Sequence, residues 1–170
     1  MPSKEKKCVI IGDAKIGKSC LIISQITNCF TAEYVPTHFQ HFTANFDIND
    51  TPVKILDISG QETYARIRPL NYSRADVFIV CFSIVDRDTF NNIKLEWEPE
   101  IKHHSPRSKI ILVGTKLDLC EYESRKVTTE EGEKLAKDIG AKSYVECSAF
   151  TMDGVDEVFD SLKKMLGAKN

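Results

Sequence analysis

The sequence predicts a doubly wound α/β domain, in which helices cover both faces of a mostly parallel sheet. Short apolar runs rich in β-branched residues alternate with helical patterns along the chain. These runs are continuous, as is typical of strands that are buried on both faces of a sheet. Only a short turn at 49–51 separates two of them, and so short a connection can join only antiparallel strands. One edge strand should therefore be antiparallel to the rest of the sheet.

The strands are expected, in chain order, at 8–11, 43–48, 53–58, 77–82, 110–113 and 144–145. A helix should follow the first strand. A second is indicated by Phe90, Ile93, Trp97 and Ile101, and Pro99 should bend or interrupt it. Two further helices complete the pattern and bring apolar stripes to the core. Their signals are the capping box at 128–131, followed by apolar residues at 135, 136 and 139, and the stripe at 155, 158, 159, 162 and 165.

Composition limits the classes of function. A chain of 170 residues can bury one sizeable core, and a net charge of −2 gives no support for binding a nucleic-acid polymer. The six cysteines show no zinc-type spacing, which favours buried free thiols in a reducing compartment. The sequence contains no signal peptide and no apolar run near the roughly 20 residues that span a bilayer. We therefore expect a cytoplasmic globular protein.

A phosphate-binding loop is predicted between the first strand and the first helix. Residues 12–19 fit the pattern G-x-x-x-x-G-K-[ST]. The glycines let backbone N–H groups turn toward phosphate oxygens, and the start of the helix adds further unpaired N–H groups. Lys18 would reach the β- and γ-phosphates, and the Ser19 hydroxyl would ligate Mg²⁺. The alternative, a turn with a chance Lys-Ser pair, is disfavoured by the strand and helix on either side.

A second set of residues could select the base. Asp118 follows the strand at 110–113, at the ligand edge of the sheet. Its carboxylate could accept from guanine N1–H and the exocyclic amine, whereas adenine presents an acceptor at N1. Residues 147–149 could offer N–H groups to the guanine carbonyl, and Phe30 could lie against the base or sugar. A solvated loop at Asp118, and ordinary loop or core roles for Phe30 and for residues 147–149, stay open as alternatives.

Further motifs join these along nearly the whole chain, from 7 to 166. Together the motifs lie at 12–19, 27–30, 33–37, 57, 60–62, 68–70, 76–78, 103–106, 115–118 and 146–149. They resemble those of small GTPases of the Ras superfamily, and within it of the Rho family. The Rho resemblance rests on Thr115, where most relatives have asparagine, on the Arg-Pro-Leu stretch at 68–70 and on the paired His103 and His104. It implies a single P-loop NTPase G domain over 1–170, with a six-stranded sheet.

The resemblance also implies a mechanism. Gln61 would orient the attacking water, the Gly60 N–H would contact the γ-phosphate, and Lys18 would complete the catalytic set. Ser19 and Thr37 would ligate Mg²⁺, on which Asp57 would act through water. The full nucleotide-binding set for GTP or GDP would be Ala14, Lys15, Ile16, Gly17, Lys18, Ser19, Cys20, Phe30, Tyr34, Thr37, Gly60, Lys116, Asp118, Leu119, Ser148, Ala149 and Phe150.

Two segments would change with the nucleotide, switch I at about 30–42 and switch II at about 58–72. Their effector surface would comprise Tyr34, His38, Phe39, Gln40, Phe42, Tyr64, Ile67 and Leu70, for which packing beneath the loops is the alternative. The resemblance implies a monomer whose partners are exchange factors, GTPase-activating proteins and Rho-type effectors. Such effectors are, for example, formins or kinases that act on the actin cytoskeleton.

The end at Asn170 carries no C-a-a-X box. We expect the intact protein to continue into a lipidated tail and to associate peripherally with membranes; the alternative is a protein that works without an anchor.

The sequence departs from the family pattern at several points. Ala14 replaces a glycine near the γ-phosphate and could crowd Gln61 and an activator's arginine, so we expect slow hydrolysis. Ile58 and Ser59 replace the usual Thr-Ala pair, and Leu56 replaces a tryptophan that exchange factors use. Only the nine residues 119–127 separate Asp118 from the capping box, so the extra helix of most Rho proteins should be absent.

Two other functions stay open. One is a nucleotide-dependent binding module with negligible hydrolysis, controlled by exchange alone, which Ala14, Ile58 and Ser59 favour and Gln61 opposes. The other is a P-loop nucleoside or nucleotide kinase. A kinase would need an arginine-rich lid and a second substrate pocket, and the sequence after Val77 indicates neither.

Overall fold

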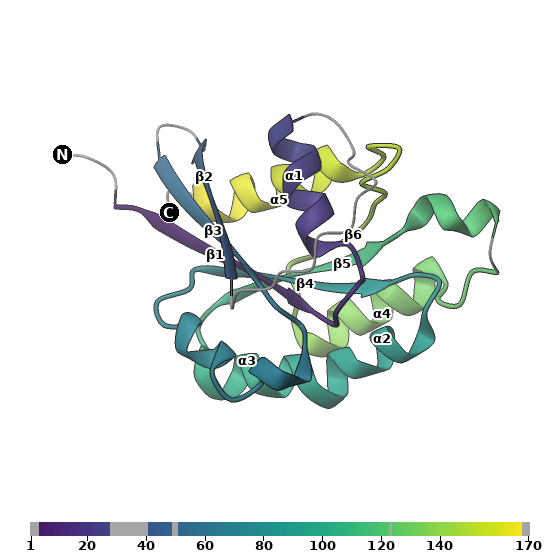
Figure 1. Ribbon diagram of the computed structural model, residues 1–170, viewed down its shortest axis with the longest axis horizontal. Coiled ribbons are helices and arrows are strands. Elements are labelled where there is room, and N and C mark those ends of the chain that lie inside the picture. The colour runs from purple at the N-terminus through teal and green to yellow at the C-terminus, as the bar shows by residue number, and fades with distance from the viewer. Residues whose placement is uncertain (1–3, 28–40, 49–50, 123, 168–170) are drawn as a thin grey trace.

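The computed structural model describes residues 4–27, 41–48, 51–122 and 124–167. These residues form a six-stranded sheet in the order β2-β3-β1-β4-β5-β6 (Figure 1). β2 pairs with β3 in antiparallel fashion at one edge, and the other pairs are parallel. This confirms the predicted mixed sheet. The strands are β1 (Lys6–Gly12), β2 (His41–Ile48), β3 (Thr51–Ile58), β4 (Val77–Ser83), β5 (Lys109–Thr115) and β6 (Ser143–Glu146).

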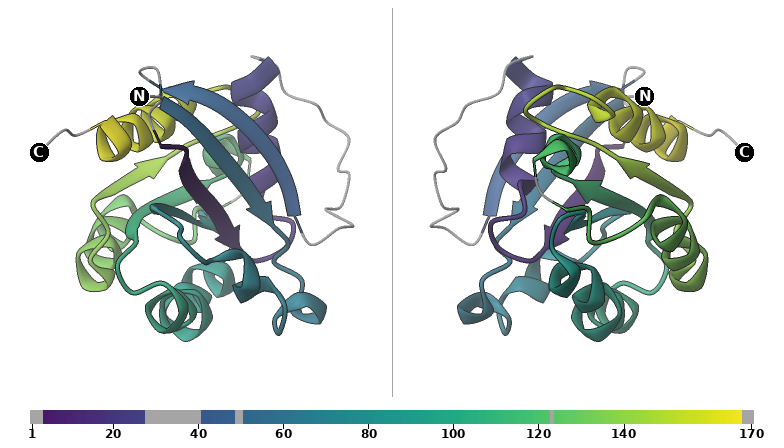
Figure 2. Two further views of the ribbon diagram at one scale, coloured as in Figure 1. Left: turned by 90° about the vertical axis from the view of Figure 1, so that its left-hand side faces the viewer. Right: turned by 90° about the vertical axis from the view of Figure 1, so that its right-hand side faces the viewer.

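Helices cover both faces of the sheet, as expected. α1 (Lys18–Thr27) and α5 (Val155–Gly167) lie on one face. α2 (Arg87–Asn92), α3 (Glu98–His104) and α4 (Thr129–Ile139) lie on the other. Figure 2 shows these layers from two sides, with the first and last helices above the sheet and the three others below it.

The alternation of side chains along β1 explains how one strand serves both layers. Cys8 and Ile10 point into the core under α1 and α5, whereas Val9 and Ile11 point into the core over α2, α3 and α4. All four side chains are fully buried. A continuous apolar run is thus what a central strand between two helical layers requires.

The helix that should be interrupted near Pro99 is divided into three parts. α2 continues into the π-helical turn η3 (Ile93–Trp97), which leads directly into α3. Pro99 lies in the first turn of α3, directly after this π-helical turn, whose last N–H, that of Glu98, bonds to the Ile93 carbonyl. The interruption was predicted, but its form as a wide turn before the proline was not. Such turns are frequent at functional sites.

The stretch between Asp118 and the capping box is short, as expected. Among its described residues, the 3₁₀ turn η4 (Leu117–Glu121) is the only helical element. The capping box is present: the Thr128 hydroxyl accepts from the Glu131 N–H, and the Glu131 carboxylate accepts from the Thr128 N–H. Two more 3₁₀ turns, η1 (Glu62–Tyr64) and η2 (Arg68–Asn71), follow β3.

The described cysteines are free thiols, and burial separates them into two groups. Cys8, Cys81 and Cys147 are buried, and burial raises the pKa of the Cys147 thiol to about 12. Cys20 and Cys120 are only partly buried, so the expectation of buried thiols is wrong for these two. None of the described helices has the length and apolar character needed to cross a membrane.

Candidate nucleotide-binding site

The loop at 12–17 joins β1 to α1 in a tightly curled conformation. Gly12 has a φ of 145°, Lys15 of 62° and Gly17 of 96°. A Cβ atom on Gly12 would lie 2.4 Å from the Cys81 carbonyl oxygen, so only glycine fits there. The backbone therefore follows the path that the phosphate-binding pattern predicts.

The Lys18 side chain closes this loop from inside. Its ammonium donates to the carbonyl oxygens of Gly12 at 2.9 Å and Asp13 at 2.5 Å, and the residue is 7% exposed. Burial lowers the pKa of Lys18, although the charge of Asp57 opposes this shift. A buried cation thus lies directly behind the loop. Phosphate oxygens could replace the two carbonyl oxygens as its hydrogen-bond acceptors.

Ser19 and Asp57 meet beside the loop. Asp57 lies near the end of β3 and pairs in register with Ile10 of β1, which brings its fully buried side chain to the start of α1. The Ser19 hydroxyl donates to the Asp57 carboxylate. A hydroxyl and a carboxylate are hard oxygen donors of the kind that Mg²⁺ prefers. Among the described residues, no group of three or more His, Cys, Asp or Glu side chains could hold a metal ion. The pair therefore fits a Mg²⁺ ion that Ser19 would ligate directly and on which Asp57 would act through water.

Gly60 lies against the phosphate loop. A Cβ atom there would be 2.1 Å from the Gly12 carbonyl oxygen and 2.7 Å from the Ala14 nitrogen. Real Cβ atoms do not approach backbone so closely, so this contact requires glycine. It brings the start of switch II next to the backbone of Ala14.

A cavity of about 770 Å³ lies between the loop, η4 and the segment that follows β6. This volume is within the range of small-molecule sites. The predicted residues that line it are Lys15, Ile16, Gly17, Cys20, Lys116, Asp118, Leu119, Ala149 and Phe150. Three segments that are far apart in the sequence thus surround one space, as predicted for a base and its sugar.

The wall that carries Asp118 is tied to the phosphate loop. Lys116 has a left-handed conformation with a φ of 63°, and its Nζ donates to the Lys15 carbonyl at 2.8 Å. The Thr115 hydroxyl donates to the Ile16 carbonyl at 2.6 Å. Both contacts hold the end of β5 against the loop. They fix the distance between a phosphate site and a base site.

Ser148 has a different role from the one expected. Its N–H donates to the Asp153 carbonyl at 2.8 Å, because the loop after β6 closes on itself. The backbone of Ser148 is thus engaged within its own loop, and the wall of the cavity is formed by Ala149 and Phe150 instead. The buried Ser148 hydroxyl donates to Asp118 Oδ1 at 2.7 Å. This bond orients the carboxylate that would read the base.

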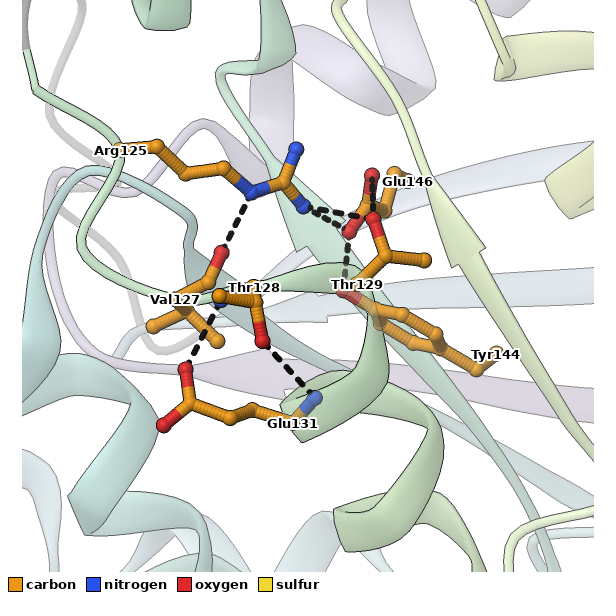
Figure 3. A network of polar contacts seen from close by, with 7 residues as sticks. All are labelled: Arg125, Val127, Thr128, Thr129, Glu131, Tyr144 and Glu146. Atoms are coloured by element: carbon orange, nitrogen blue, oxygen red, sulfur yellow. Dashed lines mark hydrogen bonds and ion pairs between the residues drawn. The ribbon is translucent and has the colours of Figure 1, made fainter.

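A polar network braces both base-binding segments (Figure 3). Arg125 forms an ion pair with Glu146, the residue immediately before Cys147. The same carboxylate accepts from Tyr144 Oη at 2.8 Å and from Thr129 Oγ1 at 3.3 Å. Burial, followed by the bond to Glu146, raises the pKa of the Tyr144 hydroxyl, which keeps it a donor. The network links the segment after η4 to the end of β6.

Sequence reasoning missed several residues of this site. Leu21, Thr115 and Tyr122 also line the cavity, together with Cys147, which belongs to the predicted segment 147–149. Thr115 belongs to a recognised motif but was not expected at the site, and it could have been inferred from its neighbour Lys116. Tyr122 is 81% exposed, and no pattern in its surroundings marks it.

Other predicted residues lie elsewhere or outside the described chain. Tyr64 and Ile67 are half-buried, whereas Leu70 is 78% exposed, so Leu70 does not pack beneath the loop. Phe42 lies in β2, and its side chain is not described. Outside the described residues are Phe30, Tyr34, Thr37, His38, Phe39 and Gln40.

Comparison with protein families agrees with this geometry. A family model described as the Ras family matches residues 7–167. The match includes every element that surrounds the cavity and the phosphate loop.

Proposed function

The chain belongs to the Ras family of small GTPases, and we propose that it is a GTP-hydrolysing switch of the Rho type. Small GTPases of this family generally bind GTP and GDP with Mg²⁺, hydrolyse GTP and interact with effectors, exchange factors and GTPase-activating proteins. The observation that best supports hydrolysis is the contact of Gly60 with the phosphate loop. Gln61 follows Gly60 directly in the chain, which supports the proposal that it acts beside a terminal phosphate.

The residues around the loop have separate tasks in this proposal. Lys18 would exchange its two carbonyl partners for phosphate oxygens when nucleotide enters. Ser19 would ligate Mg²⁺ and Asp57 would act on it through water, and the ion would neutralise charge on the phosphates. Gln61 would orient the attacking water. Phosphoryl transfer needs mainly positioning and charge stabilisation, and these residues supply both.

Guanine selectivity would come from Asp118. The bond from Ser148 leaves Oδ2 and the remaining acceptor capacity of Oδ1 for the two donors of guanine. Adenine would place an acceptor against the carboxylate, and bidentate recognition of a base edge is worth about 1–3 kcal/mol of discrimination.

Signalling of the Rho type is supported by sequence features rather than by the cavity. These are Thr115, the Arg-Pro-Leu stretch at 68–70 and the paired His103 and His104. We propose effectors of the actin cytoskeleton, with the exposed Leu70 as part of their binding surface. Leu56 is buried in β3, so a Rho-type exchange factor would have to use other contacts there. The proposed location is the cytoplasm, with peripheral membrane association if a lipidated tail follows.

Slow hydrolysis is part of the proposal. Ala14 adds a methyl group at the point where Gly60 already approaches the loop backbone. This crowding also supports a second candidate, a nucleotide-dependent binding module that is controlled by exchange alone.

Single-turnover hydrolysis of γ-labelled GTP in the presence of Mg²⁺ separates the two candidates. The proposal predicts slow turnover that Gln61→Leu abolishes and Ala14→Gly accelerates. Tight GTP binding without turnover that depends on Gln61 would instead establish the exchange-controlled module.

A further inference from the structure

A chain of buried contacts begins at Asp13 in the phosphate loop. Trp97, the last residue of the π-helical turn, is 1% exposed, and its Nε1–H donates to Asp13 Oδ1 at 2.7 Å. Asn92 Nδ2 donates to Asp13 Oδ2 at 2.6 Å. Both oxygens of this carboxylate are therefore held by the junction of α2 and η3, on the face of the sheet away from α1.

The same tryptophan ring contacts switch II. The guanidinium carbon of Arg68 lies 4.3 Å from the centroid of the Trp97 ring, a cation–π geometry. Arg68 Nε and Nη2 donate to Glu100 Oε1 and Oε2 at 2.9 and 2.8 Å. Tyr72 Oη also donates to Glu100. Trp97 is thus in contact with the phosphate loop through its indole N–H and with switch II through its ring.

Arg68 is held as a buried cation in these contacts. It is 4% exposed, and burial opposes its charged form, but the hydrogen bonds and charge of Glu100 outweigh this and raise its pKa. A buried ion pair is weak evidence for stability, because apolar residues of similar volume often stabilise as well or better. What the fork of Arg68 on Glu100 supplies is a defined position for the chain.

That position matters for the exposed part of switch II. Arg68 begins the 3₁₀ turn η2, which also contains the exposed Leu70. A displacement of Arg68 over the Trp97 ring would therefore move the surface that carries Leu70. A displacement of Asp13 would act on the same ring from the phosphate loop.

We propose that Asp13, Trp97, Arg68 and Glu100 form a positioning relay between the phosphate loop and the end of switch II. The relay carries a change in the phosphate loop to the surface around Leu70, and it does so without touching the reacting atoms. This inference rests on the proposed function in one respect, namely that a guanine nucleotide occupies the phosphate loop.

The chain contains a single tryptophan, so tryptophan emission reports on the surroundings of the Trp97 ring. We would record Trp97 emission of the full chain loaded with GDP and with a non-hydrolysable GTP analogue. The relay variants are Arg68→Gln, which removes the cation, and Glu100→Gln, which removes the charge that anchors it. The matched control is Arg66→Gln, at an exposed arginine of the same segment. Loading of every variant is measured separately by release of bound nucleotide.

The relay predicts that emission differs between the two nucleotide states in the wild type and in Arg66→Gln. Both relay variants should reduce this difference, because part of it comes from the position of the Arg68 cation over the Trp97 ring, while both nucleotides are still loaded. A merely structural role for Arg68 would lower stability and leave the difference intact. Identical wild-type emission in the two states, or a full difference in both relay variants, would overturn the relay. Failure of the wild type to load guanine nucleotide would overturn the proposed function itself, so the two failures are distinguishable.

Discussion

Replacing Arg125 with alanine should weaken GDP binding by about 5- to 30-fold. Arg125 pairs with Glu146 and also donates from Nε to the Val127 carbonyl at 2.6 Å. The two charged side chains are 29% and 15% exposed, so the pair lies between a surface pair and a buried one. Breaking a surface pair costs about 0–1 kcal/mol, and breaking a buried pair costs about 3–5 kcal/mol. We expect about 1–2 kcal/mol, and each 1.4 kcal/mol is a factor of about ten in affinity.

The cost should fall on nucleotide binding because of where the pair lies. Glu146 adjoins the segment that contains Ala149 of the cavity wall, and Arg125 belongs to the segment that follows Asp118. The assay is the dissociation rate of a fluorescent GDP analogue, together with the thermal unfolding of the same variant.

Arg87→Ala is the matched control, because Arg87 pairs with Glu131 at the surface, where the side chains are 44% and 39% exposed. This control should change the dissociation rate by less than about twofold. An unchanged rate for Arg125→Ala, with a lowered unfolding temperature, would refute the reasoning. The network would then support the fold and not the base-binding segments.

Three further predictions follow from contacts in the structure. Gly60→Ala should abolish GTP hydrolysis measured in single turnover while GDP loading persists, because its methyl group would displace switch II from the phosphate loop. Gly132→Ala should lower the free energy of unfolding by about 1–2 kcal/mol in denaturant titrations, because its Cβ would lie 2.2 Å from the Tyr144 ring and the strain exceeds the gain in helix propensity. The hydrogen bond from Arg87, then that from a backbone N–H, lowers the pKa of Glu131 from 4.5 to about 2. The ionised Glu131 carboxylate therefore contributes to the free energy of unfolding above pH 4.5, and this contribution is lost as the pH falls toward 2. In denaturant titrations at several pH values, Glu131→Gln should reduce the change in the free energy of unfolding over that pH range.

The sheet could be predicted because its signals are local. Each strand is a continuous apolar run, and the turn at 49–51 is too short for any connection but an antiparallel one. Most strand ends were predicted one or two residues short, since polar residues such as Lys6 and Glu146 belong to strands without belonging to the apolar runs. The π-helical turn has no comparable signal, because its apolar residues also fit an α-helix.

The candidate site divides in the same way. The phosphate loop and Asp118 could be predicted because each combines a motif with a position at the carboxyl end of a strand. The contacts that position them could not, because they join residues that are distant in the sequence. Trp97 and Asp13 are 84 residues apart, and no periodicity connects them. The hydroxyl role of Ser148 likewise depends on how the loop up to Asp153 closes.

The central claim is that this cavity binds guanine nucleotides through Asp118. Competition between GDP and ADP for a bound fluorescent GDP analogue tests it most directly, with Asp118→Asn as the matched variant. The account predicts that GDP displaces the analogue at a concentration roughly 10- to 100-fold lower than ADP, as expected for a bidentate base contact. Asp118→Asn should lose most of this preference. Equal displacement by ADP and GDP in the wild type would contradict the account.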